Sequence, residues 1–356
     1  MPKSKDAHAG SRRPTPYPEL NALLERLVNG ARAALGDNFV GAYLHGSFAL
    51  GDADERSDVD FVIVTRQDLS PDALAALQAL HAELHQLPNH WAMRLEGSYA
   101  PAAIIRRRSP EPRDPPGEPR PDNWTDPGAS GLHPEVYPFW FIGNGRDKLV
   151  RSEHDNREIP RWILRERGVV LAGPNPRGLI EPVTAEMVRA EAQALIEIFA
   201  KLAVEGDLLK THLFQCFAAL AAARALHTID TGRVNSKAAA VTFAKHRLEA
   251  RFAALVERGW TEREERPARD ADMGAYVERP ADPDAAAATL ELLRYAQHEA
   301  ARLAEARALV ERRIAAQRHG PADAHTWSGE RGRGGAPRRG GWSPSVTRPG
   351  GRGRRG

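Results

Sequence analysis

Apolar residues in the first part of the chain follow two different spacings. Over residues 17–35 they recur every three or four positions, which predicts a helix that ends near Gly36. Residues 39–44 and 59–64 are instead continuous apolar runs rich in strand-forming side chains, and they predict two strands. A polar connection of fourteen residues separates the two strands.

A second helix and a third strand continue this pattern. Ser70 followed by Pro71 is typical of a helix start, with the serine as N-cap and the proline in the first turn. Residues 91–100 then predict a strand. Elements in the order helix, strand, strand, helix, strand are typical of a small α/β core.

The middle of the chain loses this regularity. Residues 110–138 hold nine prolines in 29 positions, which excludes regular structure and predicts a long inserted loop. Beyond it, residues 155–167 predict a helix with Asp155 as its N-cap, and residues 168–174 predict a strand or turn. The alternative for residues 154–156 is a contact with a bound acceptor.

The last long segment, residues 184–318, is rich in Ala, Leu, Glu and Arg at helical spacing. Glycines and prolines divide it, and the pattern predicts four or five helices. Thr184 is placed to cap the first of them, although Met187 lacks the side chain that a capping box uses. The expected fold class is therefore α+β, with a small mixed sheet and its helices followed by an all-α bundle.

These patterns divide the chain into four expected parts. They are a disordered N-terminus over residues 1–16, a first domain over 17–175, a helical domain over 176–318 and a disordered tail over 319–356. The tail holds eleven glycines and eight arginines against two acidic residues, a net charge of +6. Because the whole chain carries +3, the remainder carries −3, so the basic character lies in the tail.

Composition excludes several classes of protein. Hydrophobic residues make up 42% of the chain, enough for a sizeable core, and no apolar run is long enough to span a membrane. No secretory signal is visible, and the single cysteine, Cys216, excludes an internal disulfide and any multi-cysteine metal site, so a cytoplasmic protein is expected. His81, His85 and His90 have no further ligand of a known pattern, and we expect a solvated helix face there.

The connection between the first two strands carries the clearest chemistry. Gly46 and Ser47 follow the first strand, and ten residues later Asp58 and Asp60 head the second. Side chains alternate along a strand, so both carboxylates are expected on one face, where they suit a magnesium ion. A glycine lets the backbone approach phosphate oxygens closely. The plainer alternative, in which the aspartates only open a strand, does not account for the whole set.

This arrangement resembles the signature of the nucleotidyltransferase superfamily, whose catalytic domain is a polymerase-β-like palm. In that family the paired aspartates hold magnesium and the nucleotide triphosphate, the Gly-Ser pair contacts phosphates, and a later strand adds a third carboxylate. The resemblance assigns that third role to Glu96, which lies 36 residues after Asp60. The alternative for Glu96 is an exposed strand residue with no catalytic role.

Residues 20–305 are more closely similar to the aminoglycoside and spectinomycin O-adenylyltransferases, in which a helical domain follows the palm. Residues 165–183 are similar to the segment that joins the two domains. In the helical domain that family carries an arginine and, thirteen residues later, a lysine, both contacting ATP phosphates. Arg224 and Lys237 have this spacing here. Taken singly, each would pass for an ordinary helix-surface charge.

The resemblance implies transfer of AMP from ATP to a hydroxyl of an aminoglycoside or spectinomycin-type antibiotic, and hence antibiotic resistance. Asp58, Asp60 and Glu96 would hold Mg²⁺, Glu96 would act as general base, and Ser47 and Ser57 would position phosphates. The expected partners are ATP and a small hydroxyl acceptor, with no membrane and no second copy of the chain.

The acceptor half of the resemblance is incomplete. The tryptophan and aspartate of that family's antibiotic pocket have no secure match, since Trp140 lies in a different local context. Two alternatives therefore stay open. One is a nucleotidyltransferase acting on RNA, protein or another metabolite, with the Arg/Gly tail recruiting nucleic acid. The other is a non-catalytic binder, against which the complete set of Gly46, Ser47, the two aspartates and Glu96 argues.

Overall fold

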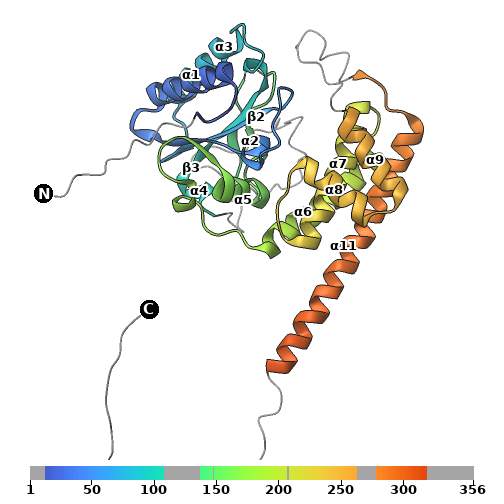
Figure 1. Cartoon of the computed structure of the whole chain (residues 1–356). Helices are drawn as coiled ribbons and strands as arrows, with labels where there is room; N and C mark the ends of the chain where they lie inside the picture. Colours follow the sequence, from blue (N-terminus) through green and yellow to red (C-terminus); the bar gives the residue numbers. More distant parts are fainter. Residues whose placement is uncertain (1–12, 108–136, 147, 207, 263–277, 319–356) are drawn as a thin grey trace, which may run out of the picture. The chain divides into compact units, whose positions relative to one another are not determined.

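The computed structural model describes five stretches of the chain, residues 13–107, 137–146, 148–206, 208–262 and 278–318 (Figure 1). Most of the predicted N-terminus, nearly all of the proline-rich insertion and the whole Arg/Gly tail lie outside them. Contacts divide the chain into two compact units, Met1–Arg307 and Ala308–Gly356. The expected division near residue 175 falls inside the first unit and stays a prediction.

A mixed sheet of six strands forms the first half of this unit, in the order β5-β4-β3-β2-β1-β6. The strands are β1 Phe39–Leu44, β2 Val59–Thr65, β3 Leu95–Pro101, β4 Phe139–Ile142, β5 Val150–Ser152 and β6 Val169–Ala172. β2 and β3 run parallel, and every other neighbouring pair is antiparallel. The parallel pair requires a crossover, which helix α3 (Pro71–His85) makes.

Helices cover both faces of the sheet. Helix α1 (Pro18–Leu35) and α3 lie over one face (Figure 1), where Phe61 and Ile63 of β2 join their leucines in one core. On the opposite face Val62 and Val64 pack with residues of α4 (Ala102–Ile105) and α5 (Glu158–Arg167). Because side chains alternate along β2, Asp60 belongs to this second face.

The predicted elements of this region are largely present, and the differences concern the starts of two elements and several short elements that were not predicted, among them the helices α2 (Gly46–Leu50) and α4. The strand expected over residues 91–100 begins only at Leu95, because η2 (Ala92–Arg94) is a single 3₁₀ turn. The guanidinium of Arg94 in that turn donates to the carbonyl of Arg56 at 2.7 Å. The helix expected from residue 155 begins at Glu158, and β4 and β5 have no counterpart in the sequence prediction.

His81 does not lie on a solvated face, as the sequence prediction had it. It is 4% exposed, its ring is stacked on Phe61, and its Nε2 lies 2.8 Å from the hydroxyl of Tyr99. Burial, with a smaller contribution from His85, lowers the pKa of His81 to about 4. His81 is therefore a neutral residue of the core between α3 and the sheet.

Five α-helices follow β6 in the part of the chain that the structure describes. They are α6 Ala185–Glu205, α7 His212–Thr231, α8 Lys237–Arg247, α9 Ala250–Glu262 and α11 Pro283–Arg318. Their common core is rich in alanine. The architecture confirms the predicted α+β class, a mixed sheet with helices followed by a helical region.

The cap of α6 differs from the prediction in one detail. The hydroxyl of Thr184 accepts a hydrogen bond from the Met187 amide at 3.3 Å, and the Thr184 amide donates to the Met187 sulfur at 3.5 Å. Met187 thus closes a capping box with its thioether, the weak acceptor that sequence reasoning did not count. No helix among the described residues has the length and apolar character needed to cross a bilayer.

Candidate active site

The register of the parallel strand pair brings Asp60 and Glu96 side by side. Asp60 of β2 is the direct partner of Glu96 of β3, so neighbouring strands carry the two residues on the same face of the sheet. Asp58 precedes the strand, which begins at Val59, rather than lying within it. Asp58, Asp60 and the distant Glu96 therefore lie at the same end of β2 and β3.

Gly46 is in direct contact with this group. It opens the short helix α2 (Gly46–Leu50) with φ +55°, a left-handed conformation that side chains disfavour. A Cβ atom built on Gly46 would lie 1.8 Å from Oδ2 of Asp60. The absence of a side chain at position 46 is thus a steric requirement, and it lets the α2 backbone press against the Asp60 carboxylate.

Burial dominates the electrostatics of Asp60. It raises the pKa of the carboxyl, His45 opposes this shift, and the like charges of Asp58 and Asp155 reinforce it. A cation bound among these carboxylates would offset that cost. An all-oxygen donor set is also what Mg²⁺ prefers, so the residues present fit the ion that the sequence analysis predicted.

The loops around the carboxylates fix their neighbours. The side-chain amide of Asn144, which follows β4, donates to Oδ1 of Asp58. Ser57 is buried, and its hydroxyl donates to Asp54 at 3.1 Å and accepts from the Asp54 amide at 2.9 Å, so it closes the turn before β2. The carbonyl of Ser47 accepts from the amide of Gly51 at 2.9 Å, which holds the end of α2.

A second layer of polar side chains lies behind Asp60 and Glu96, and sequence reasoning missed most of it. Nε2 of His154 lies 3.4 Å from Oε1 of Glu96. The neighbouring Asp155 is buried, accepts from the hydroxyl of Ser98 at 2.6 Å and lies 3.7 Å from Nε2 of His45. Asp155 is therefore part of this network and not the N-cap of α5, which is Arg157.

The surroundings of His154 lower the pKa of its imidazole, which favours the neutral form. Burial lowers its pKa, while the negative charges of Asp155 and Asp60 act in the opposite direction and Arg157 adds to the lowering. A neutral imidazole can donate a hydrogen bond to the Glu96 carboxylate. It adds no positive charge that would compete with a bound cation for that carboxylate. The only sequence signal for this contact was the polar His-Asp-Asn run at residues 154–156.

Arg224 lies near Asp60, and Lys237 lies near the loop after α2, although both belong to the helical region. Burial lowers the pKa of Arg224, and the negative charges of Asp52 and Asp60 oppose that shift, which places its guanidinium within electrostatic reach of Asp60. Lys237 is the first residue of α8, and its backbone amide donates to Asp52 at 3.0 Å. Asp52 thus ties the loop after α2 to the start of α8.

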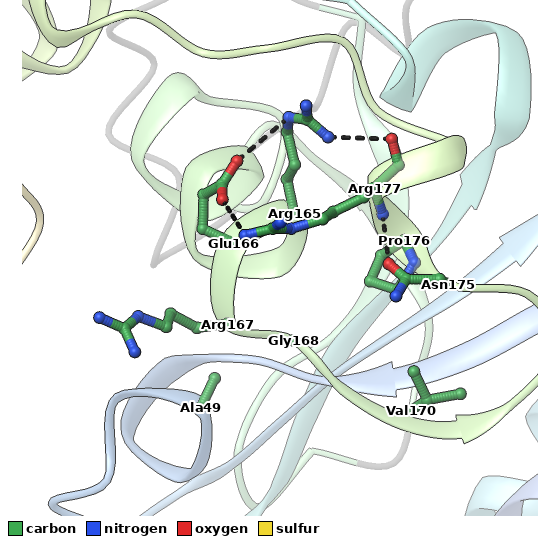
Figure 2. A pocket seen from close by; sticks show the side chains of 9 residues that line it. All are labelled: Ala49, Arg165, Glu166, Arg167, Gly168, Val170, Asn175, Pro176 and Arg177. Carbon is green, nitrogen blue, oxygen red and sulfur yellow. Dashed lines mark hydrogen bonds and ion pairs between the residues drawn. The ribbon is translucent and has the colours of Figure 1, made fainter. Parts of the chain in front are cut away.

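A hollow of 450 Å³ lies beside α5 and contains none of the predicted residues. Figure 2 shows Arg165, Glu166 and Arg177 engaged with one another, while Arg167 points away from them. Glu166 pairs with Arg165 at 3.2 Å and with Arg177 at 2.6 Å, and Arg165 also donates to the Arg177 carbonyl at 2.9 Å. These contacts connect α5 to the turn at residues 176–178.

Residues 28–106 match the family described as Nucleotidyltransferase domain. This stretch contains β1, β2, β3 and the whole carboxylate group. This stretch of the chain is similar to a nucleotidyltransferase domain. The matched segment ends just after β3, so Asn144, His154 and Asp155 belong to parts of the sheet beyond it, and Arg224 and Lys237 belong to the helical region.

The chain is also similar to a solved structure, that of spectinomycin adenyltransferase AAD(9) from Enterococcus faecialis with ATP and spectinomycin. The TM-score is 0.51 at 12% identity, over 78% of this chain and 98% of that chain. At this identity the likeness concerns the fold. No curated protein matches the sequence. The domain match and this fold together support a nucleotidyltransferase enzyme.

Proposed function

We propose that this protein transfers AMP from ATP to a hydroxyl group of a small molecule of the aminoglycoside or spectinomycin type. The observation that carries the proposal is the pairing of Asp60 with Glu96 in the β2–β3 register, with Gly46 pressed against Asp60. The fold shared with an enzyme whose structure holds ATP and spectinomycin supports the choice of nucleotide and acceptor. Modification of such an antibiotic would confer resistance.

Each residue of the site has a role in this reaction. Glu96, whose side chain is 19% exposed, takes the proton from the acceptor hydroxyl, and His154 orients the Glu96 carboxylate from behind. The hydroxyl oxygen bonds to the α-phosphorus as the bond to the departing pyrophosphate breaks. Arg224 and Lys237 offset the negative charge that develops on the pyrophosphate. Gly46 and Ser47 present backbone to the phosphates, and Ser57 keeps the turn in place.

Magnesium fits this scheme at the carboxylates. Asp58, Asp60 and Glu96 would hold Mg²⁺, which supplies charge neutralisation for the triphosphate when bound. Asn144 keeps Asp58 in position for this by its bond to Oδ1. Asp60 and Glu96 lie on adjacent strands, so the sheet sets their spacing, and Asp58 directly precedes β2.

The test is pyrophosphate release from ATP with Mg²⁺ in the presence of spectinomycin, streptomycin and a panel of aminoglycosides. We expect release that depends on one of these acceptors. Asp60→Asn and Glu96→Gln should each lower kcat/KM by about 100-fold or more, the range for loss of a charge-stabilising or proton-transferring group. Glu311→Gln, an exposed carboxylate of α11, is the matched control and should retain full activity.

Two results would count against the proposal. Full activity in Asp60→Asn would remove the catalytic role of the carboxylates. ATP binding without release in any antibiotic would reject this acceptor class and favour an RNA, a protein or another metabolite. Mass spectrometry of the product, showing an acceptor heavier by one AMP moiety, identifies the group transferred.

A pair of glycine variants tests the contact between α2 and Asp60. Gly46 and Gly51 both have positive φ, +55° and +85°, but only a Cβ at Gly46 meets another residue. Gly46→Ala should displace Asp60 and lower kcat by about 100-fold, as small misplacements of reacting groups do. Gly51→Ala carries the same kind of backbone strain and should stay within a few-fold of wild type. Equal losses of kcat in both variants would show that backbone strain around α2, and not the contact with Asp60, causes the effect.

A further inference from the structure

Three ligand-type side chains converge in the helical region, on residues to which the proposed reaction gives no role. His212 and Cys216 lie one turn apart at the start of α7, and Glu262 is the last residue of α9. Their donor atoms all lie within 4.8 Å of one another. No other such group of three is present in the part of the chain that the structure describes.

Close helix packing brings Glu262 to this position. Gly259 lies one turn before Glu262 on α9, and a Cβ atom there would lie 3.1 Å from the carbonyl oxygen of Cys216. A side chain at position 259 would push α9 away from α7. The glycine therefore allows the two helices to approach closely enough for the Glu262 carboxylate to reach the Cys216 sulfur.

The three atoms form a triangle of nearly equal sides. Sγ of Cys216 lies 3.7 Å from Nε2 of His212 and 3.3 Å from Oε2 of Glu262, and these last two atoms lie 3.4 Å apart. In a tetrahedral zinc site with bonds of about 2.3 Å to sulfur and about 2.0 Å to nitrogen and oxygen, neighbouring donors lie roughly 3.3–3.6 Å apart. The sides of the triangle lie within about 0.2 Å of those between three corners of such a tetrahedron.

Burial and charge agree with this geometry. The side chains of His212 and Glu262 are 2% and 15% exposed, and Cys216 is buried. A thiolate and a carboxylate together balance a divalent cation, and the mixture of sulfur, imidazole and carboxylate donors is one that suits zinc. Arg258 holds the other carboxylate oxygen, Oε1 of Glu262, at 2.6 Å, which leaves Oε2 directed at the triangle.

We propose that His212, Cys216 and Glu262 bind one Zn²⁺ ion, with water at the fourth position, and that this ion clamps the start of α7 to the end of α9. On binding, the Cys216 thiol releases its proton to solvent and its hydrogen bond to Glu262 is replaced by the two metal bonds. The site is separate from the carboxylates of the sheet, since Cys216 precedes Arg224 by two turns of α7.

Cobalt gives a decisive reading because Cys216 is the only cysteine of the chain. The full-length protein is stripped of metal and titrated with Co²⁺ in excess Mg²⁺, which occupies oxygen-only sites. We expect a near-ultraviolet sulfur-to-cobalt charge-transfer band that saturates at one equivalent and disappears when Zn²⁺ is added. Metal analysis of the untreated protein should find about one zinc per chain.

Variants assign the ligands. Cys216→Ser should abolish the band, and His212→Gln and Glu262→Gln should each weaken cobalt binding by more than about tenfold, because even the outer partners of ligands contribute 10- to 100-fold. His246→Ala, an exposed histidine of α8, should bind cobalt like wild type. Far-UV circular dichroism identifies any variant that fails to fold. The variants that do fold then show which residues are metal ligands.

The proposal fails on either of two results. Wild-type protein without a charge-transfer band at millimolar Co²⁺ would leave a hydrogen-bonded triad of His212, Cys216 and Glu262 and no metal site. A band of unchanged affinity in both His212→Gln and Glu262→Gln would show that cobalt binds the sulfur without these partners. Neither outcome bears on nucleotidyl transfer, so the two proposals stand or fall separately.

Discussion

The sheet region and the helical region fill their cores with side chains of different size. In the core under α1 and α3, five of 22 buried residues are alanine, ten are leucine, and Trp91, Phe61 and Tyr99 are among the rest. In the helical core, 11 of 21 are alanine. The sheet region is thus stabilised by large apolar side chains, and the helical region by close approach of helix backbones. The two cores should respond to substitution in opposite ways.

The largest effect is expected from truncation in the sheet core. Phe61 is 1% exposed and has His81 and Tyr99 as ring neighbours, so Phe61→Ala removes a large apolar surface and leaves a cavity. We expect a loss of about 3–5 kcal/mol in the free energy of unfolding. Hydrogen exchange measures the loss by region. A larger increase in exchange rate in β2 than in α7 would support separate responses of the two cores. An equal increase in both would show that the two cores unfold together.

The next effect is a pH dependence that arises from His81 in the sheet core. Burial lowers the pKa of His81 from 6.5 to about 4, so the unfolded chain binds a proton in a pH range where the folded chain does not. The free energy of unfolding should therefore fall as the pH drops from 6.5 towards 4, by about 3 kcal/mol in total. Above pH 6.5 His81 contributes no pH dependence.

Urea unfolding at pH 7 and at pH 4.5 measures this effect. His81→Gln retains a partner for the Tyr99 hydroxyl but does not titrate, so its loss of stability over that range should be smaller than that of wild type by more than 2 kcal/mol. His246→Ala, on an exposed face of α8, is the control for histidine removal as such. Parallel curves for wild type and His81→Gln would contradict the assignment.

The smallest effect is expected from enlargement in the helical core. Ala223 is fully buried in α7, and Ala223→Leu must force neighbouring helices apart, at a cost of about 1–3 kcal/mol. Ala287→Leu, at an exposed position of α11, should change stability by less than about 0.5 kcal/mol. Thermal unfolding of the pair measures the difference. An unchanged unfolding temperature for Ala223→Leu would show that the helical core has enough unfilled volume for a leucine.

The two regions also differed in how far the sequence predicted them. The position of β1 was predicted to the residue, because a local apolar run decides it. The β2–β3 register places Asp60 beside Glu96, a residue that only the family resemblance had singled out. Arg224 and Lys237 lie on helices whose approach to the sheet is a tertiary matter. Their spacing pointed to the site only through a family resemblance.

What sequence reasoning missed depends on pairing rather than on pattern. β4 and β5 have four and three residues, too few for a periodicity to emerge, and they follow the proline-rich insertion. Without them Asn144, His154 and Asp155 had no predicted place beside β3. His81 and His85 shared a predicted helix face, and only the packing of α3 on the sheet decides which of the two is buried.

The parallel register of β2 and β3 has a consequence for how this chain can change length over evolutionary time. Insertions in the loops on either side of α3 leave Asp60 opposite Glu96, because the register is fixed by the ladder between the strands. One residue added within β3 before Glu96 would turn its side chain to the opposite face, under α3, while the strand itself still paired. The loops around the crossover can therefore gain or lose residues without harm to the site. The first residues of β3 cannot, because a shift there would give a folded protein without its third carboxylate.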